Sequence, residues 1–153
     1  ETNESNQRLI ADEGGIPLLI ALLEDHFDVH REAAGALWSL AEDPTNQQLI
    51  AQAGGIPKLL DLLKQESRNS VSAQETATGA LHRLAFNPDN RNEIANYTYM
   101  RGPDEVVTGI QTIIFLFDGA STETKQHVTD ALLMLTKDNP SNQFNVAHKL
   151  VEQ

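Results

Sequence analysis

The sequence contains no cysteine, so it can form neither a disulfide framework nor a thiolate metal site. Aromatic residues account for only 5% of the 153 residues, although hydrophobic residues together reach 40%. A core must therefore be built from aliphatic side chains. The length suits one domain of ordinary size. The lack of cysteine is typical of an intracellular protein, and we expect a cytoplasmic or nuclear location.

Basic residues are scarce. The chain has 11 of them against 22 acidic residues, for a net charge of −11. Ten acidic and two basic residues fall in 1–45, four of each in 46–89, and eight acidic and five basic in 90–153. A surface this negative repels phosphate backbones, so we expect no nucleic-acid partner. The acidic amino-terminal third is either a solvated face or an attraction for a basic partner.

Long apolar runs are also missing. The strongest, residues 113–117, is far shorter than the ~20 residues that span a bilayer, and we expect no membrane insertion. The sequence has no Walker phosphate loop, no dinucleotide-binding glycine motif and no nucleophile elbow. We therefore expect neither an enzyme nor a cofactor.

The histidines offer little more for catalysis. His26 and His30 are four residues apart, with Asp25 and Asp28 beside them. Because His26 falls in a turn and no glutamate completes a His-Glu-x-x-His motif, we expect no metal there. His82, His127 and His148 are predicted to be separate surface residues.

What the chain does contain is a repeat. The segment Gly14-Gly15-Ile16-Pro17 returns as Gly54-Gly55-Ile56-Pro57, 40 positions later. The segment 6–11 (NQRLIA) likewise returns as 46–51 (NQQLIA), and 35–38 (GALW) returns less closely as 79–82 (GALH). Self-similarity at this period is the sequence signature of stacked helical units.

Each unit is predicted to contain three helices. A short helix begins at Asn46, the Gly54-Gly55 pair breaks the chain, and Ile56-Pro57 starts a second helix. An apolar stripe at spacing i, i+3, i+4, i+7 follows in both copies. A longer third helix is predicted over 71–86, and over 29–41 in the first copy. Ala33, Leu37 and Leu40 are predicted to face the core.

The third copy has diverged. Asn90 marks its start and Asp130-Ala131-Leu132 replaces Gly-Ala-Leu, but the Gly-Gly-Ile-Pro segment is missing. We expect a longer turn at 97–103, followed by a second helix with Val106, Ile110, Ile113 and Phe117 on its apolar stripe. The starting asparagines are Asn6, Asn46, Asn90 and Asn142, and their spacing grows from 40 to 44 to 52 residues. Extra residues in loops are how a repeat array tolerates length change.

The succession Asn-x-x-x-Ile-Ala, Gly-Gly-Ile-Pro and Ala-Ala-Gly-Ala-Leu-x-x-Leu-Ala resembles the armadillo repeat, closely over 6–41 and 46–86 and loosely over 90–136. The resemblance implies an all-α fold: a right-handed α-solenoid of about three armadillo repeats, with three helices each, plus the start of a fourth. The single domain spans 1–153, with repeats at about 6–45, 46–89 and 90–141 and a partial one at 142–153. We expect a segment of a longer array.

The resemblance also implies a concave groove, lined by the third helices, that holds an extended segment of another protein. In importin-alpha-type members, asparagines and tryptophans on these helices bind the peptide. Those asparagine positions fall here on Ser39, Arg83 and Met134, and the tryptophan positions on Gly35, Gly79 and Asp130. None matches, so the Gly-Ala-Leu form is closer to catenin-like and plant-type repeats.

Helical geometry of 100° per residue sorts the third helices independently of any family. The outward positions form the predicted groove: Arg31, Gly35, Trp38, Ser39 and Glu42; Glu75, Gly79, His82, Arg83 and Phe86; and Gln126, Asp130, Leu133, Met134 and Lys137.

Two of these residues are central to the hypothesis of a binding groove. Trp38, the single tryptophan, is either a binding anchor or a residue packed beneath His82 or under a preceding unit. Arg83 either binds a carboxylate of a partner or pairs with Glu75 or Glu42. The expected function is a protein-interaction module. The alternatives are a structural subunit that contacts an assembly through the loops at 66–72 and 96–103, or the recognition arm of a larger protein such as a ubiquitin ligase.

Overall fold

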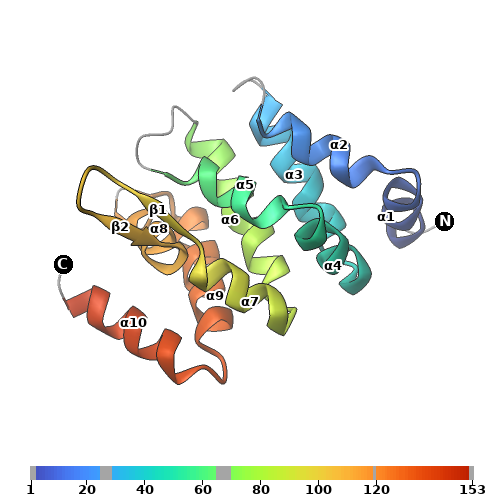
Figure 1. The fold of residues 1–153 in the computed structure, drawn as a ribbon. Helices are drawn as coiled ribbons and strands as arrows, with labels where there is room; N and C mark the ends of the chain where they lie inside the picture. Colours follow the sequence, from blue (N-terminus) through green and yellow to red (C-terminus); the bar gives the residue numbers. More distant parts are fainter. Residues whose placement is uncertain (1–2, 25–28, 65–69, 119, 152–153) are drawn as a thin grey trace.

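The computed structural model describes residues 3–24, 29–64, 70–118 and 120–151. Within those residues the chain forms ten helices and one two-stranded hairpin (Figure 1). The first unit contains α1 (Asn3–Asp12), α2 (Gly15–Leu22) and α3 (His30–Leu40). The second contains α4 (Pro44–Gln52), α5 (Gly55–Leu62) and α6 (Val71–Leu84). The third contains α7 (Pro88–Asn96), β1 (Thr98–Met100), β2 (Val106–Thr108), α8 (Gly109–Phe115) and α9 (Thr122–Thr136), and α10 (Pro140–Val151) opens a fourth.

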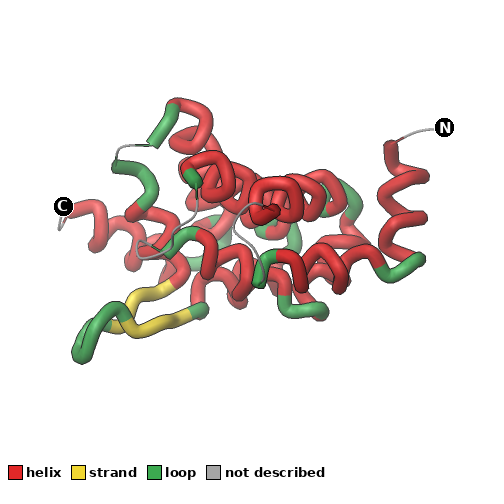
Figure 2. The backbone as a smooth tube through the Cα atoms, turned by 90° about the horizontal axis from the view of Figure 1, so that it is seen from above, coloured by secondary structure: helices red, strands yellow, loops and turns green. Residues whose placement is uncertain are grey.

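The units stack in one direction. The third helices α3, α6 and α9 lie side by side through the middle of the molecule, and the two termini lie at opposite ends (Figures 1 and 2). One continuous aliphatic core runs between the units, from Ile16 in the first to Leu135 in the third. The predicted all-α solenoid is confirmed, with the hairpin as its one departure among the described residues.

Each glycine of the Gly-Gly-Ile-Pro turn is required for a different physical reason. Gly54 has a φ of 78° and Gly14 a φ of 77°, a left-handed conformation that residues with a β-carbon rarely adopt. Gly55 instead lies against the preceding helix, because a β-carbon there would be 2.6 Å from Ile50 Cγ2. The first glycine turns the chain and the second lets α5 approach α4.

The repeated asparagines join successive units. Asn6 is exposed, whereas the other three are buried. Each of those three donates a hydrogen bond from its side-chain amide to a carbonyl near the end of the preceding third helix: Asn46 to Leu40 over 3.1 Å, Asn90 to Leu84 over 3.1 Å and Asn142 to Leu135 over 2.8 Å.

The start of α4 differs from the prediction. The helix begins at Pro44 and not at Asn46, because Asp43 accepts a hydrogen bond from the Thr45 amide over 2.7 Å and so caps the new helix. Proline at the first helical position suits this start, since its missing amide hydrogen would have no intrahelical partner.

The expected long turn at 97–103 is wrong. The chain forms an antiparallel hairpin there, in which Thr98 pairs with Thr108 and Met100 with Val106. Val106 is therefore an exposed strand residue and does not belong to the apolar stripe of the second helix. Phe117 lies beyond the end of α8 and is exposed as well.

Gly109 restores the repeat after the hairpin. A β-carbon at this position would lie 1.8 Å from the Ile94 carbonyl oxygen, so Gly109 does for α8 what Gly55 does for α5. Thr108 and Gln111 then form a reciprocal capping box that starts α8. The third unit thus keeps the close helix approach of the turn although its sequence has changed.

The hairpin is tied to its neighbours by polar and aromatic contacts. The Tyr97 hydroxyl, just before β1, donates to the Asp61 carboxylate of α5. The Lys64 ammonium lies 4.7 Å from the centre of the Tyr99 ring. On the other side, the Arg101 guanidinium lies 4.6 Å from the Phe115 ring of α8. The insertion therefore connects the second unit to the third.

Candidate functional site: the face of the third helices

The residues predicted for the core side of α3, the third helix of the first unit, are buried as expected: Ala33, Leu37 and Leu40. Of the predicted groove residues on α3, Arg31 and Ser39 are exposed, while Gly35 and Trp38 are half-buried. The members of the predicted set are thus not equally accessible, and Gly79 on α6 is buried.

Trp38 packs across the face of the neighbouring helix. A β-carbon at Gly79 of α6 would lie 2.8 Å from Trp38 Cε2, so only glycine leaves room for the indole. Beyond Gly79, the indole meets the imidazole of His127 on α9 edge-on, with ring centres 4.9 Å apart and an interplanar angle of 82°. Trp38 therefore touches all three units, and the predicted contact with His82 is replaced by one with His127.

His127 is the groove residue that sequence reasoning missed. It was expected to be a separate surface residue, yet it is half-buried and its Nε2 atom has no hydrogen-bond partner. The signal was present, because His127 precedes Asp130 by three residues and so lies on the same helical face. The face of α9 therefore contributes an aromatic contact to the centre of the site.

His82 lies beside this centre. Its ring stacks at a tilt on Phe86, which follows the end of α6, with centres 5.4 Å apart. Burial lowers the pKa of His82, and the attraction of Asp130, which raises it, does not compensate. The lowered pKa favours the neutral imidazole, which adds aromatic surface next to the exposed Phe86 ring.

Three predicted groove residues, Glu75, Gln126 and Asp130, form hydrogen bonds within the protein, and those of Glu75 fix the start of α9. The Glu75 carboxylate accepts hydrogen bonds from the hydroxyls of Ser121 and Thr124, over 3.1 and 3.0 Å, at the start of that helix. The Gln126 amide donates to Asp130 over 2.9 Å. These carboxylates already have partners within the protein, which reduces the attraction that this part of the face offers to a basic peptide.

Arg83 pairs internally, with Glu42 as one of the two predicted partners. The Arg83 guanidinium lies 3.7 Å from the Glu42 carboxylate, and both side chains are partly exposed. A pair of this kind stabilises the fold little. The pair borders a hollow of about 440 Å³ between the ends of α3 and α6, which Phe86, Pro44 and Pro88 also line.

The remaining predicted residues are less prominent. Arg31 pairs with its neighbour Glu32 over 2.8 Å on the exposed surface. Met134 packs partly against the core, and Leu133 is exposed at the far side of α9. The structure thus brings together Trp38 with Gly79, and Glu42 with Arg83 and Phe86, but it does not gather the whole predicted set at one point.

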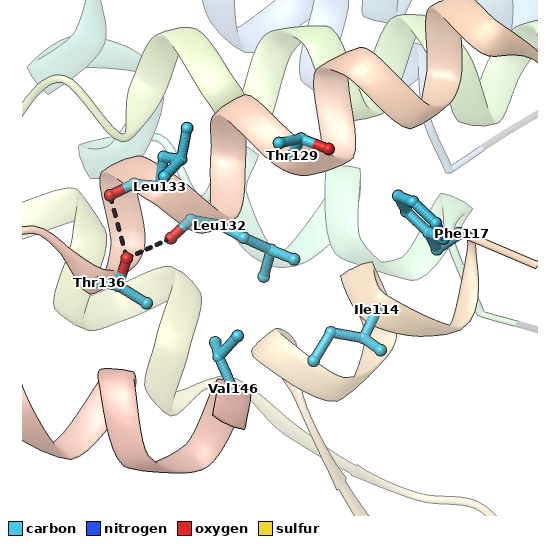
Figure 3. Close-up of a pocket in the computed structure, with 7 residues that line it drawn as sticks. All are labelled: Ile114, Phe117, Thr129, Leu132, Leu133, Thr136 and Val146. Atoms are coloured by element: carbon cyan, nitrogen blue, oxygen red, sulfur yellow. Dashed lines mark hydrogen bonds between the residues drawn. The ribbon is translucent and has the colours of Figure 1, made fainter. Parts of the chain in front are cut away.

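A second hollow lies at the carboxyl-terminal end, away from the predicted groove (Figure 3). Its volume is about 280 Å³. Its walls are almost entirely apolar and come from α8, α9, α10 and the chain just after α8: Ile114, Phe117, Thr129, Leu132, Leu133, Thr136 and Val146. The Thr136 hydroxyl is turned back to the carbonyls of its own helix, to Leu132 over 2.8 Å and Leu133 over 3.2 Å.

Metal and membrane sites were also considered. His26 and its aspartate neighbours lie outside the described residues, and His30 is buried at the start of α3. In the described part of the chain, no three His, Asp or Glu side chains are grouped as metal ligands. No helix among these residues has the length and apolar composition that crossing a bilayer would require.

Comparison with known proteins places the chain in a family. The profile of the armadillo/beta-catenin-like repeat matches residues 3–42 and 43–86. A crystal structure of an engineered protein is similar over 86% of this chain, with 25% sequence identity and a TM-score of 0.71. This chain spans about half of that protein, 49% of its length. No curated protein matches the sequence.

The chain therefore belongs to the armadillo/beta-catenin-like repeat family. Armadillo repeats are in general protein-binding modules, and their solenoid is in general a non-enzymatic scaffold. The matched segments end at residue 86, so the third unit, with its hairpin, is assigned by the structure.

Proposed function

We propose that the face formed by α3, α6 and α9 binds an extended segment of a partner protein. The observation that supports this most is the hollow between α3 and α6, where Glu42 and Arg83 stand beside the exposed Phe86 ring. A hollow with one aromatic wall and a charged pair at its mouth suits an apolar side chain of the segment, flanked by polar groups. The indole of Trp38 would border the same path.

The distribution of charge supports a segment that is not strongly basic. The groove carboxylates Glu42, Glu75 and Asp130 each have a hydrogen-bond or ion-pair partner within the chain. A basic peptide would have to compete with these partners. An extended segment held by main-chain contacts and one or two apolar side chains fits the face better.

The test starts from random peptides of about twelve residues, displayed and selected against the chain, because about twelve extended residues span ~40 Å. For the peptides selected, we expect the double variant Trp38→Ala, Arg83→Ala to raise the dissociation constant at least about tenfold, as loss of a central anchor does. The control is Arg101→Ala, which removes an arginine from the hairpin. Unchanged affinity in a double variant with a native circular dichroism spectrum would contradict the groove proposal.

The hairpin supports one alternative, that of a structural subunit with contacts outside the groove. Met100 and Val106 form an exposed cross-strand pair on β1 and β2. A photoreactive residue at position 100 would then crosslink the partner, and one at position 86 would not. The groove proposal expects the opposite pattern.

A further inference from the structure

The face formed by α3, α6 and α9 carries two histidines on neighbouring helices at its centre. His82 lies on α6 and His127 on α9, and both side chains are half-buried. A positive charge on His127 lowers the pKa of His82, so the two imidazoles are close enough to repel each other when both are protonated. Protonation of one histidine therefore affects protonation of the other.

The packing of His127 suits its neutral form. Its Nε2 atom is buried and has no hydrogen-bond partner, and its ring meets the Trp38 indole edge-on, with ring centres 4.9 Å apart. A neutral imidazole can leave one ring nitrogen without a hydrogen, but an imidazolium carries a hydrogen on both nitrogens. Protonation of His127 in this position would therefore bury a charged donor that has no acceptor, and the charged ring is more stable in water.

The carboxylates of this face have partners other than the two imidazoles. On α9, Asp130 accepts a hydrogen bond from Gln126 over 2.9 Å. On α6, Glu75 accepts hydrogen bonds from hydroxyls at the start of α9. On α3, Glu42 pairs with Arg83. Among the described residues, none of these carboxylates is hydrogen-bonded to either histidine. The charged side chains of the face are Arg31 and Glu42 on α3, Glu75 and Arg83 on α6, and Asp130 on α9.

The surroundings of His82 favour the neutral state as well. Burial lowers the pKa of His82 below its ordinary value of 6.5, Asp130 opposes this change, and the positive charges of Arg83 and His127 add to it. A histidine whose pKa is lowered on folding contributes stability that is complete above the ordinary value. This stability is lost as the pH falls from that value to the folded-state pKa. Acid therefore weakens the packed arrangement of this face.

We propose that the centre of this face is a pH-sensitive switch, in which protonation of His127, with His82 beside it, releases the Trp38 indole from α9 while the helices remain folded. At neutral pH, Trp38 reaches from α3 across Gly79 to His127 and so contacts all three units. In mildly acidic solution His127 turns toward water and this bridge opens. The switch is a property of the chain alone and is independent of what the groove binds.

Acrylamide quenching of the fluorescence of Trp38, the single tryptophan, tests the proposal on the whole chain. We expect the quenching constant of the wild-type protein to rise at least about twofold as the pH falls from about 7.5 to about 5, the range in which histidines titrate. The quenching constant is measured in place of the intensity because an imidazolium beside an indole can itself reduce the emission.

Three variants assign the transition to its residues. His127→Gln retains a polar side chain that does not titrate, and its quenching constant should be the same throughout this pH range. His82→Gln removes the neighbouring positive charge, so the transition should remain and its midpoint should move to higher pH. His148→Gln is the control, because it changes an exposed histidine of α10 and should behave as the wild type does. His127→Phe replaces His127→Gln if the latter is unfolded.

Circular dichroism over the same pH range separates release of the indole from unfolding, and the helical signal should stay constant. The proposal is overturned if the quenching constant of the wild type does not change, if it rises only together with a loss of helical signal, or if the non-titrating variant at position 127 keeps the transition. A smaller quenching constant at acidic pH, as attraction between an imidazolium and the indole would give, overturns it as well. None of these measurements involves a bound peptide, so a failure of the groove proposal would leave them unchanged.

Discussion

The Trp38 side chain occupies the space that is left free because Gly79 has no side chain. The indole of α3 lies where a β-carbon on α6 would be, 2.8 Å from Cε2, and continues to His127 of α9. The glycine of the Gly-Ala-Leu motif is therefore required here by the neighbouring unit. In the first unit the same motif position, Gly35, has nothing closer than Thr76 Cγ2 at 3.9 Å.

This difference gives a matched pair of variants. Gly79→Ala should destabilise the protein by about 1–3 kcal/mol, because the added methyl displaces an aromatic ring that is packed on both sides. Gly35→Ala should be neutral or stabilising by up to about 1 kcal/mol, since alanine favours the helix and meets ordinary contacts. Urea unfolding followed by the fluorescence of the single tryptophan measures both. Equal effects of the two substitutions would contradict the packing described.

A second prediction follows from the hydrogen bonds by which the buried asparagines join successive units. Asn90 donates from its side-chain amide to the Leu84 carbonyl over 3.1 Å and to the Gln47 carbonyl over 3.2 Å, both in the interior. Asn90→Ala should cost about 1–3 kcal/mol of unfolding free energy, because it removes two buried hydrogen bonds at once. Asn6→Ala changes the equivalent but exposed residue, and should cost less than about 0.5 kcal/mol. Thermal or urea unfolding of the two variants tests the comparison.

The Asp43 carboxylate predicts how stability depends on pH. Hydrogen bonds from Arg8, and then from the Thr45 amide, lower the pKa of Asp43 below its ordinary value of 3.8. A lowered folded-state pKa contributes stability that is complete above the ordinary value and is lost as the pH falls through the folded-state pKa.

Asp43→Asn should therefore reduce stability at neutral pH and flatten its loss between about pH 5 and about pH 3. Asparagine still caps α4, so the change reports mainly on the charge. Asp12→Asn, at an exposed carboxylate of α1, makes the same change in net charge elsewhere. Urea unfolding at a series of pH values distinguishes them, and parallel pH profiles for wild type and Asp43→Asn would refute the prediction.

The hydrogen bond from Tyr97 to Asp61, which anchors the hairpin to α5, can be tested by removing one oxygen atom. Tyr97→Phe removes the hydroxyl that donates to Asp61 and leaves the ring near Lys64 in place. We expect a loss of about 0.5–1.5 kcal/mol, the usual net worth of such a bond. Amide hydrogen exchange should become faster in β1 and β2 than in α3. Uniform exchange changes along the chain would argue against a local anchor.

The repeating parts of the fold could be predicted because two copies of the same sequence pattern must fold in the same way. Gly14 and Gly54 mark the same turn, and the buried asparagines mark the same junction, whatever lies between. The hairpin could not be predicted, because Thr98–Met100 and Val106–Thr108 are too short for alternation to be recognised, and they replace a motif that the other units share.

The candidate site was predictable only in part, for a different reason. Helical periodicity gives the side of the helix on which Arg83 or Glu75 lies, but not the partner that each finds there. Glu75 binds the start of α9, 46 residues further along the chain, and Trp38 passes over Gly79 to reach His127. Such contacts depend on the angle between units. The apolar hollow near Leu132 was missed because its lining residues have the sequence pattern of a core.

The hairpin also has a mechanical consequence. It ties α5 to the third unit outside the helix stack, through Tyr97 and Asp61, whereas the first and second units are tied there by the ion pairs of Lys58 with Glu24 and of Arg83 with Glu42, which are partly exposed and therefore weak. Bending of the superhelix should therefore be uneven, with a stiff second joint and a compliant first one. A ligand lying along all three third helices would then be accommodated mainly by a change in curvature at the α3–α6 joint, beside the hollow that Arg83 borders.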